Sequence, residues 1–236
     1  MLVEKGLASG REQAKALIME GHVLVNGVAV TKAGTIIDTG VSIELTAPKM
    51  PYVSRGGLKL EAALDHFGID VRGVTAMDVG SSTGGFTDCL LKRGARRVYC
   101  VDVGYGQLSW SLRNDPRVIL LEKTNIRYLE KARVPETVDL AVIDVSFISL
   151  QKVIPRVREF LGNRGEVLAL VKPQFEVGKG EVGKGGIVRD EDRRMAAVER
   201  VRFFTEGLAF RSMGPFLSPV PGQKGNREYF LYLRRE

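Results

Sequence analysis

The chain has 236 residues, of which 35 are Lys or Arg and 28 are Asp or Glu, giving a net charge of +7; 44% are hydrophobic. This length allows one large and one small globular domain, and the charge favours a polyanionic partner, although many basic enzymes bind no nucleic acid. No apolar run approaches the ~20 residues of a membrane span, and the charged start, Met1 to Lys5, does not resemble a signal peptide. Two cysteines and two histidines are too few for a zinc site. We therefore expect a cytoplasmic protein without membrane or metal binding.

Residues 1–46 form the first predicted unit. Ser9 and Glu12 have the spacing of a capping box, which predicts a helix start there. Val23 to Val30 is predicted to form a hairpin that turns at Asn26-Gly27, because these two residue types readily adopt the positive φ that both turn positions need. Further short strands are suggested by apolar residues at Ile36, Val41, Ile43 and Leu45.

Residues 47–54 contain two prolines and no periodicity, so they are expected to be a linker. From residue 55 onward, helices and apolar strands alternate, which predicts an α/β fold with a doubly wound parallel sheet and an antiparallel edge. The expected strands are 74–79, 96–101, 117–121, 138–143, 165–171, 208–217 and 227–234. The expected helices are 58–67, 85–93, 106–113, 149–161 and 190–206.

A glycine loop, Gly80 to Gly85, follows the strand that ends with Asp78-Val79 and opens a helix. Glycines let the backbone approach a ligand closely, so this order predicts the floor of an adenosyl cofactor site. Asp102 ends the next apolar run, where a carboxylate can bind two ribose hydroxyls.

Three kinds of nucleotide site compete for this loop. A P-loop would need a lysine after Gly85, where Phe86 stands, and a dinucleotide fingerprint would need glycine at Ser82. S-adenosylmethionine has no phosphates, and its amine suits the acid at Asp78. An ordinary strand-to-helix turn is the plain alternative, which the two acids at successive strand ends disfavour.

Four charged residues stand near the same sheet edge. Asp144 and Lys172 each follow an apolar strand, Lys59 lies on the first helix after the linker, and Glu228 opens the last strand. A lysine among apolar residues is costly to bury without a partner, so the two acids are expected to pair with the two lysines.

Two resemblances extend these predictions. The helix and hairpin, with Leu24-Val25-Asn26-Gly27, resemble an S4-type RNA-binding domain. Nearly the whole chain resembles the TlyA family, an S4 domain joined to an FtsJ-like 2′-O-methyltransferase, often labelled haemolysin. This likeness is carried by Ser54 to Leu60, Asp78 to Asp88, Val101 to Leu108, Leu112 to Val118, Asp144 to Leu150, and Val171 to Gly180.

The resemblance implies a Rossmann-like class I methyltransferase sheet in 55–236 and S-adenosylmethionine as cofactor. It implies a catalytic tetrad at Lys59, Asp144, Lys172 and Glu228. It implies cofactor contacts at Asp78, Gly80, Ser82, Gly84, Gly85, Asp102, Thr124, Asn125 and Phe147, and it implies RNA contacts at Arg11, Lys15, Lys32 and Arg55. For Phe147, core packing is the alternative.

The family chemistry explains the tetrad. A ribose 2′-hydroxyl is a weak nucleophile, and an ammonium beside it stabilises the developing alkoxide. We expect Lys172 to take this role, with the acids holding the lysines. The expected function is methylation of a cytidine in ribosomal RNA by a monomer. Because the chain looks like the short family type, the large-subunit RNA is the expected target. The small-subunit RNA is left open as a second target. A haemolysin and a silent ribosome-assembly factor are the alternatives. The polar, glycine-rich segment 173–188 is expected to be a substrate loop or disordered.

Overall fold

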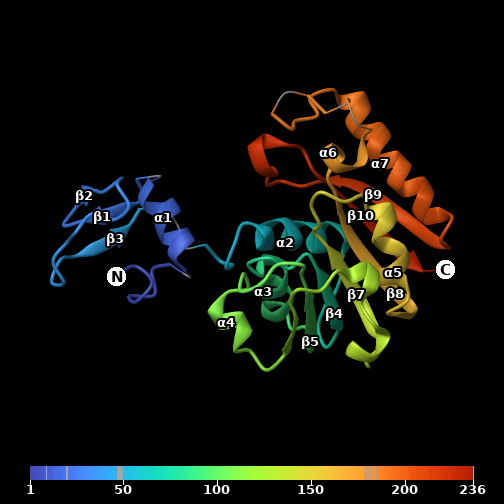
Figure 1. The fold of residues 1–236 in the computed structure, drawn as a ribbon, viewed down its shortest axis with the longest axis horizontal. Coiled ribbons are helices and arrows are strands. Elements are labelled where there is room, and N and C mark those ends of the chain that lie inside the picture. The colour runs from blue at the N-terminus through green and yellow to red at the C-terminus, as the bar shows by residue number, and fades with distance from the viewer. Residues whose placement is uncertain are drawn as a thin grey trace. The chain divides into compact units, whose positions relative to one another are not determined.

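The computed structural model describes residues 1–8, 10–19, 21–46, 50–178, 180, 182–183 and 185–235. The chain divides into two compact units, Met1–Val53 and Ser54–Glu236 (Figure 1). The predicted capping box falls on Ser9 and on the Glu12 side chain, and the predicted linker begins at 47–49; all of these lie outside the described residues. So do Lys179, Glu181 and Lys184 of the expected substrate loop.

The first unit packs α1 (Arg11–Met19) with an antiparallel sheet in the order β2-β1-β3, made by β1 (Val23–Val25), β2 (Val28–Ala29) and β3 (Ile43–Leu45). Asn26 and Gly27 have φ of 49° and 79°, so the predicted hairpin turn is confirmed. The predicted strands at Ile36 and Val41 are wrong. The Thr35 hydroxyl donates to the Lys32 carbonyl oxygen at 2.7 Å, and this local turn leaves Ile36 97% exposed.

The second unit is built on a seven-stranded sheet in the order β6-β5-β4-β7-β8-β10-β9. The first five strands of this order are parallel, and β10 runs antiparallel to both β8 and β9. The predicted α/β class is therefore confirmed. The strands are β4 (Thr75–Val79), β5 (Arg97–Val101), β6 (Val118–Leu121), β7 (Val138–Ile143), β8 (Leu161–Val171), β9 (Phe210–Leu217) and β10 (Tyr229–Arg235).

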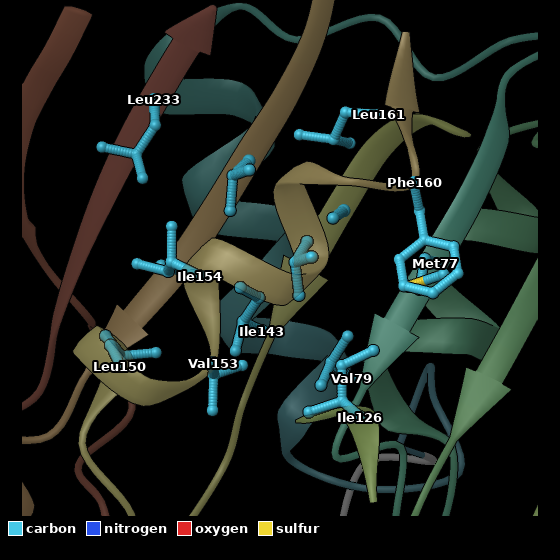
Figure 2. Packing of buried hydrophobic residues seen from close by; sticks show 14 of the residues in the cluster. Met77, Val79, Ile126, Ile143, Leu150, Val153, Ile154, Phe160, Leu161 and Leu233 are labelled. Carbon is cyan, nitrogen blue, oxygen red and sulfur yellow. The ribbon is translucent and has the colours of Figure 1, made fainter. Parts of the chain in front are cut away.

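Helices cover both faces of this sheet. Successive side chains of its apolar strands point to opposite sides, so both faces are hydrophobic and need to be buried. Figure 2 shows Leu150, Val153 and Ile154 beside Ile143 in the core of one face. The other face packs Phe86 against Phe230 and Phe67 against Tyr232. The helices are α2 (Gly56–Phe67), α3 (Gly85–Lys92), α4 (Trp110–Arg113), α5 (Ile154–Arg158), α6 (Pro173–Glu176) and α7 (Glu191–Glu206), with short 3₁₀ turns η1 (Ile126–Tyr128), η2 (Lys131–Arg133), η3 (Leu150–Lys152) and η4 (Gln223–Gly225).

Two predicted helices are shorter than expected. The helix at 106–113 is reduced to α4, because Gly106 has φ of 70° and its N–H donates to Glu122 at 2.8 Å, which holds the preceding loop in a non-helical conformation. The helix at 149–161 consists of η3 followed by α5, and it ends at Arg158 because Leu161 already pairs with Val138 as the start of β8.

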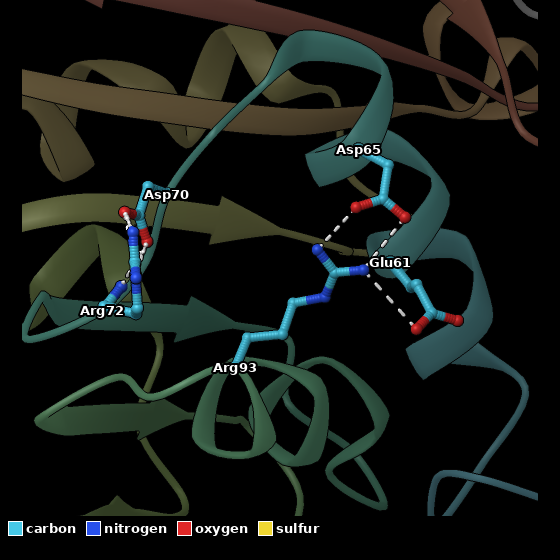
Figure 3. Close-up of polar contacts among 5 residues, drawn as sticks. All are labelled: Glu61, Asp65, Asp70, Arg72 and Arg93. Atoms are coloured by element: carbon cyan, nitrogen blue, oxygen red, sulfur yellow. Dashed lines mark hydrogen bonds and ion pairs between the residues drawn. The ribbon is translucent and has the colours of Figure 1, made fainter.

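Arg93 fastens α2 to the end of α3 (Figure 3). Its guanidinium donates to Asp65 at 2.6 and 3.0 Å and to Glu61 at 3.5 Å. These bonds lower the pKa of Asp65 below its ordinary value, with a smaller electrostatic contribution from the same arginine. Since α2 also carries Lys59, this pairing fixes the helix from which that lysine reaches the site.

Candidate active site

The glycine loop lies where β4 ends and α3 begins. Gly80 has φ of 88°, and a Cβ there would lie 2.5 Å from the Asp144 carbonyl oxygen. A Cβ at Gly85 would lie 2.9 Å from the Gly57 backbone nitrogen at the start of α2. The loop thus depends on glycine because two other backbone segments press against it.

Two cavities meet at this loop and share Gly80, Ser82 and Asp144 in their walls. The first has a volume of about 330 Å³ and is also lined by Arg55, Lys59, Asp78, Gly85, Pro221 and Gly222. The second has a volume of about 460 Å³ and is also lined by Asp102, Gln107, Thr124, Asn125, Ser146 and Phe147. An elongated ligand could therefore extend from one cavity into the other.

Asp78 is fully buried at the base of the first cavity. Its Oδ2 accepts the Thr87 backbone N–H at 3.0 Å and the Thr87 hydroxyl at 2.7 Å. Within the described residues its Oδ1 has no hydrogen-bond partner. Burial raises the pKa of Asp78 to about 7, against the opposing bonds from Thr87, and Asp144 adds to the rise.

Asp102 holds the glycine loop from the second cavity. Its Oδ2 accepts the Ser82 N–H and its Oδ1 accepts the Gly104 N–H, each at 2.7 Å. Ser82 has φ of 48°, a conformation that a non-glycine residue adopts at a cost. The two bonds leave lone pairs on both carboxylate oxygens for a further donor.

Thr124, Asn125 and Phe147 also line the second cavity. The Thr124 hydroxyl is engaged, donating to the Glu122 carbonyl oxygen at 2.8 Å and accepting from Arg133 at 3.1 Å. Phe147 is 88% exposed with φ of 62°, so the core-packing alternative is wrong. Gly84, the last of the predicted set, lines neither cavity; it has φ of 95°, precedes α3, and packs against the side chains of Leu108 and Leu112.

Two lysine–carboxylate pairs lie at this site. The Lys59 Nζ is 2.6 Å from Glu228 Oε2, and the Lys172 Nζ is 2.6 Å from Asp144 Oδ1. Lys172 also donates to the Ser146 hydroxyl at 2.9 Å. The Glu228 side chain is 3% exposed and that of Lys172 11%, so little water screens either pair. Since Lys59 and Asp144 line one cavity, the structure brings the four predicted residues together.

The predicted RNA-binding residues fall in two places. Arg11 and Lys15, one turn apart on α1, and Lys32 are exposed and line one cavity of about 370 Å³ in the first unit. Arg55 is exposed at the first cavity of the second unit.

Sequence reasoning missed Ser146, Gln107, Pro221 and Gly222. A Cβ on Gly222 would collide with the Glu228 carboxylate, so this glycine is needed for that acid to fit. Its only signal in the sequence is a Pro-Gly pair six residues before Glu228, which alone indicates a turn.

Among the residues that the structure describes, no group of three or more His, Cys, Asp and Glu side chains could hold a metal ion. In the same part of the chain, no helix has the length and apolar character needed to cross a bilayer.

Comparison with known proteins identifies both units. The S4 domain profile matches residues 1–43, and the FtsJ-like methyltransferase profile matches residues 52–235. A Mycobacterium tuberculosis protein named 16S/23S rRNA (cytidine-2′-O)-methyltransferase TlyA is 48% identical over 236 residues, which is all of this chain and 88% of that protein. A Campylobacter jejuni protein named 23S rRNA (cytidine-2′-O)-methyltransferase TlyA is 32% identical, covering 98% of this chain and 96% of its own.

A solved structure of a candidate hemolysin from Streptococcus thermophilus has a TM-score of 0.81 and 43% identity, covering 99% of this chain and 86% of that one. The hemolysin name is thus a second label for proteins of the same fold and domain order. With both domain profiles and full-length relatives in agreement, the chain belongs to the TlyA family of FtsJ-like methyltransferases with an N-terminal S4 domain.

Proposed function

We propose that the second unit binds S-adenosylmethionine and transfers its methyl group to the ribose 2′-hydroxyl of a cytidine in ribosomal RNA. The observation that carries this proposal is the pair of lysine–carboxylate contacts beside the glycine loop. Ammonium groups placed there can stabilise an oxygen that becomes negative during transfer.

The residues present fit this cofactor. Within the described residues the buried Asp78 Oδ1 has no hydrogen-bond partner, so it would accept the amino group of the methionine half in the first cavity, which Gly80 and Gly85 also line. Asp102 has free lone pairs for the ribose hydroxyls, and Thr124, Asn125 and Phe147 form walls for the adenine in the second cavity. Gly80, Ser82 and Asp144 line both cavities, so they would lie nearest the junction of the two halves.

When bound, the cofactor supplies an electrophilic methyl group, so the chain's own residues have to position and polarise the acceptor. Lys172 is the donor that would orient the 2′-hydroxyl and stabilise negative charge on its oxygen, while Asp144 holds the lysine at 2.6 Å. Lys59, held by Glu228, faces the first cavity as a second cation for the ribose-phosphate. The proton lost by the hydroxyl leaves to solvent.

Ribosomal RNA as substrate is supported by the S4 domain and by the names of the relatives. Arg11, Lys15 and Lys32 provide a cluster of exposed cations in that domain, and Arg55 provides one at the active site. We propose a cytidine of the large-subunit RNA as the principal target, modified in the cytoplasm by a monomer. The M. tuberculosis relative's name covers both subunits, so the small subunit is the comparison to measure.

The test uses isolated large and small ribosomal subunits, tritiated S-adenosylmethionine and mass mapping of the product. Lys172→Ala should bind the cofactor normally in calorimetry and lose transfer by about 10²- to 10³-fold, as for removal of an oxyanion donor. Lys131→Ala, which removes an exposed lysine of η2, is the matched control and should keep full activity. Full activity of Lys172→Ala would end the catalytic assignment, and methylation only outside the large-subunit RNA would end the substrate assignment.

A further inference from the structure

Two segments leave neighbouring strands at the active site and stay in contact beyond them. Segment 144–150 follows β7, and segment 172–176 follows β8, with Ile143 registered opposite Ala169 in the parallel pair. Lys172 joins them first, through Asp144 and Ser146. Further out, the rings of Phe147 and Phe175 lie 4.9 Å apart.

Glu176 makes the last of these contacts and is the most buried acid among them, at 8% exposure. Its Oε2 accepts the Ser149 hydroxyl at 2.6 Å, and its Oε1 accepts the Leu150 N–H at 2.8 Å. Its backbone carbonyl oxygen accepts Arg200 of α7 at 2.9 Å. Both carboxylate oxygens therefore hold segment 144–150, while the backbone is fixed to a long helix.

Burial of the Glu176 carboxylate is energetically unfavourable. Burial raises the pKa of Glu176 above its ordinary value, opposed by the bonds from Leu150 and Ser149 and by the charge of Arg200. Segment 144–150 also contains Phe147 at φ of 62°, and it has no regular structure before η3. A strained, irregular segment keeps one conformation only where its surroundings determine it.

We propose that Glu176 is a positioning residue, which holds segment 144–150 so that Asp144 and Ser146 meet Lys172 in the geometry that methyl transfer needs. This inference rests on the proposed function. Glu176 touches neither cavity, and it acts through the two bonds to Ser149 and Leu150. Loss of both bonds removes one of the ties that hold the segment with Asp144 and Ser146, and a misplacement of about 1 Å at the reacting groups can lower a rate about a hundredfold.

The experiment compares Glu176→Ala with Glu176→Gln in the full chain. Glu176→Ala should lower kcat about a hundredfold, with KM for the large subunit within about twofold of wild type. Glu176→Gln should recover kcat, because its carbonyl oxygen can accept Leu150 N–H and its amide group can donate to Ser149. Glu199→Ala, which removes a half-buried acid of α7 that pairs with Arg202, is the control and should leave kcat unchanged. Wild-type kcat in Glu176→Ala, or equal losses in both Glu176 variants, would overturn the proposal.

Thermal unfolding of each variant separates positioning from loss of fold. If Glu176→Ala does not fold, Ser149→Ala removes one of the two bonds instead. It should lower kcat about tenfold, because the lost bond is a short one, 2.6 Å, to a carboxylate. Unchanged kcat in Ser149→Ala also overturns the proposal. Failure of the proposed function looks different, because Lys172→Ala would then remain active. An inactive Lys172→Ala beside a fully active Glu176→Ala rejects the positioning role alone.

Discussion

The buried acid Asp78 should make the stability of the cofactor-free protein depend on pH. Its pKa is about 7 in the folded chain, against 3.8 for an unperturbed aspartate. Between these values the folded carboxyl keeps a proton that the unfolded chain releases, so this group lowers the free energy of unfolding as pH rises from about 4 to 7. Asp78→Asn removes the titration while an amide oxygen can still accept the two bonds from Thr87.

The size of the effect follows from the two values. One unit of pKa difference corresponds to about 1.4 kcal/mol, and integration from pH 5 to pH 8 gives about 3 kcal/mol for this single group. In urea unfolding at pH 5, 6, 7 and 8, the stability of Asp78→Asn relative to wild type should therefore rise by about 3 kcal/mol and level off above pH 7.

Asp65→Asn is the matched control for this measurement. The pKa of Asp65 is lowered by Arg93, so its stabilising contribution is complete above its unfolded value and is lost only as pH falls towards acid. Its difference from wild type should stay constant between pH 5 and 8. A constant difference for Asp78→Asn as well would refute the assignment of the titration to Asp78.

Two further predictions concern the walls of the cavities. Gly222→Ala should displace Glu228 from Lys59 and lower kcat about a hundredfold with a reduced melting temperature, whereas Gly40→Ala, where a Cβ meets nothing within 4 Å, should do neither; methyl transfer and thermal unfolding measure both. Asp102→Ala should weaken S-adenosylmethionine binding in calorimetry by about 10- to 100-fold, since it removes a ribose acceptor and the bonds that hold Ser82 at positive φ. Unchanged affinity in Asp102→Ala would place the ribose elsewhere.

Much of the fold could be predicted because strand patterns in this chain are unambiguous. β7 agrees with its predicted range of 138–143, since an apolar run in a buried parallel strand has few alternatives. β8 begins four residues earlier than predicted, at Leu161 instead of 165. Its first part contains Gly162 and Gly165, which read as breakers, and its pairing with β7 is irregular there. Only the neighbouring strand shows that this part belongs to the sheet.

The candidate site also contains residues that could be predicted from the sequence and residues that could not. Asp144 and Lys172 could be placed at one edge because parallel strands end there together. Their partners Ser146 and Glu176 could not, because each acts through a loop whose path depends on contacts with another loop. Phe147 had two open interpretations, and only its exposure decided between them.

The reversed direction of β10 has a consequence for how the site is completed. Because this strand is antiparallel to β8, its N-terminal end lies at the edge where β8 ends, and Tyr229 is registered with Val171. Glu228, the residue just before Tyr229, therefore lies across from Lys172, the first residue after β8. The acid that holds Lys59 therefore arrives only when the final strand has been inserted between β8 and β9. We therefore expect a chain with an unpaired β10 to lack the Lys59–Glu228 pair, even where Asp102 still holds the glycine loop.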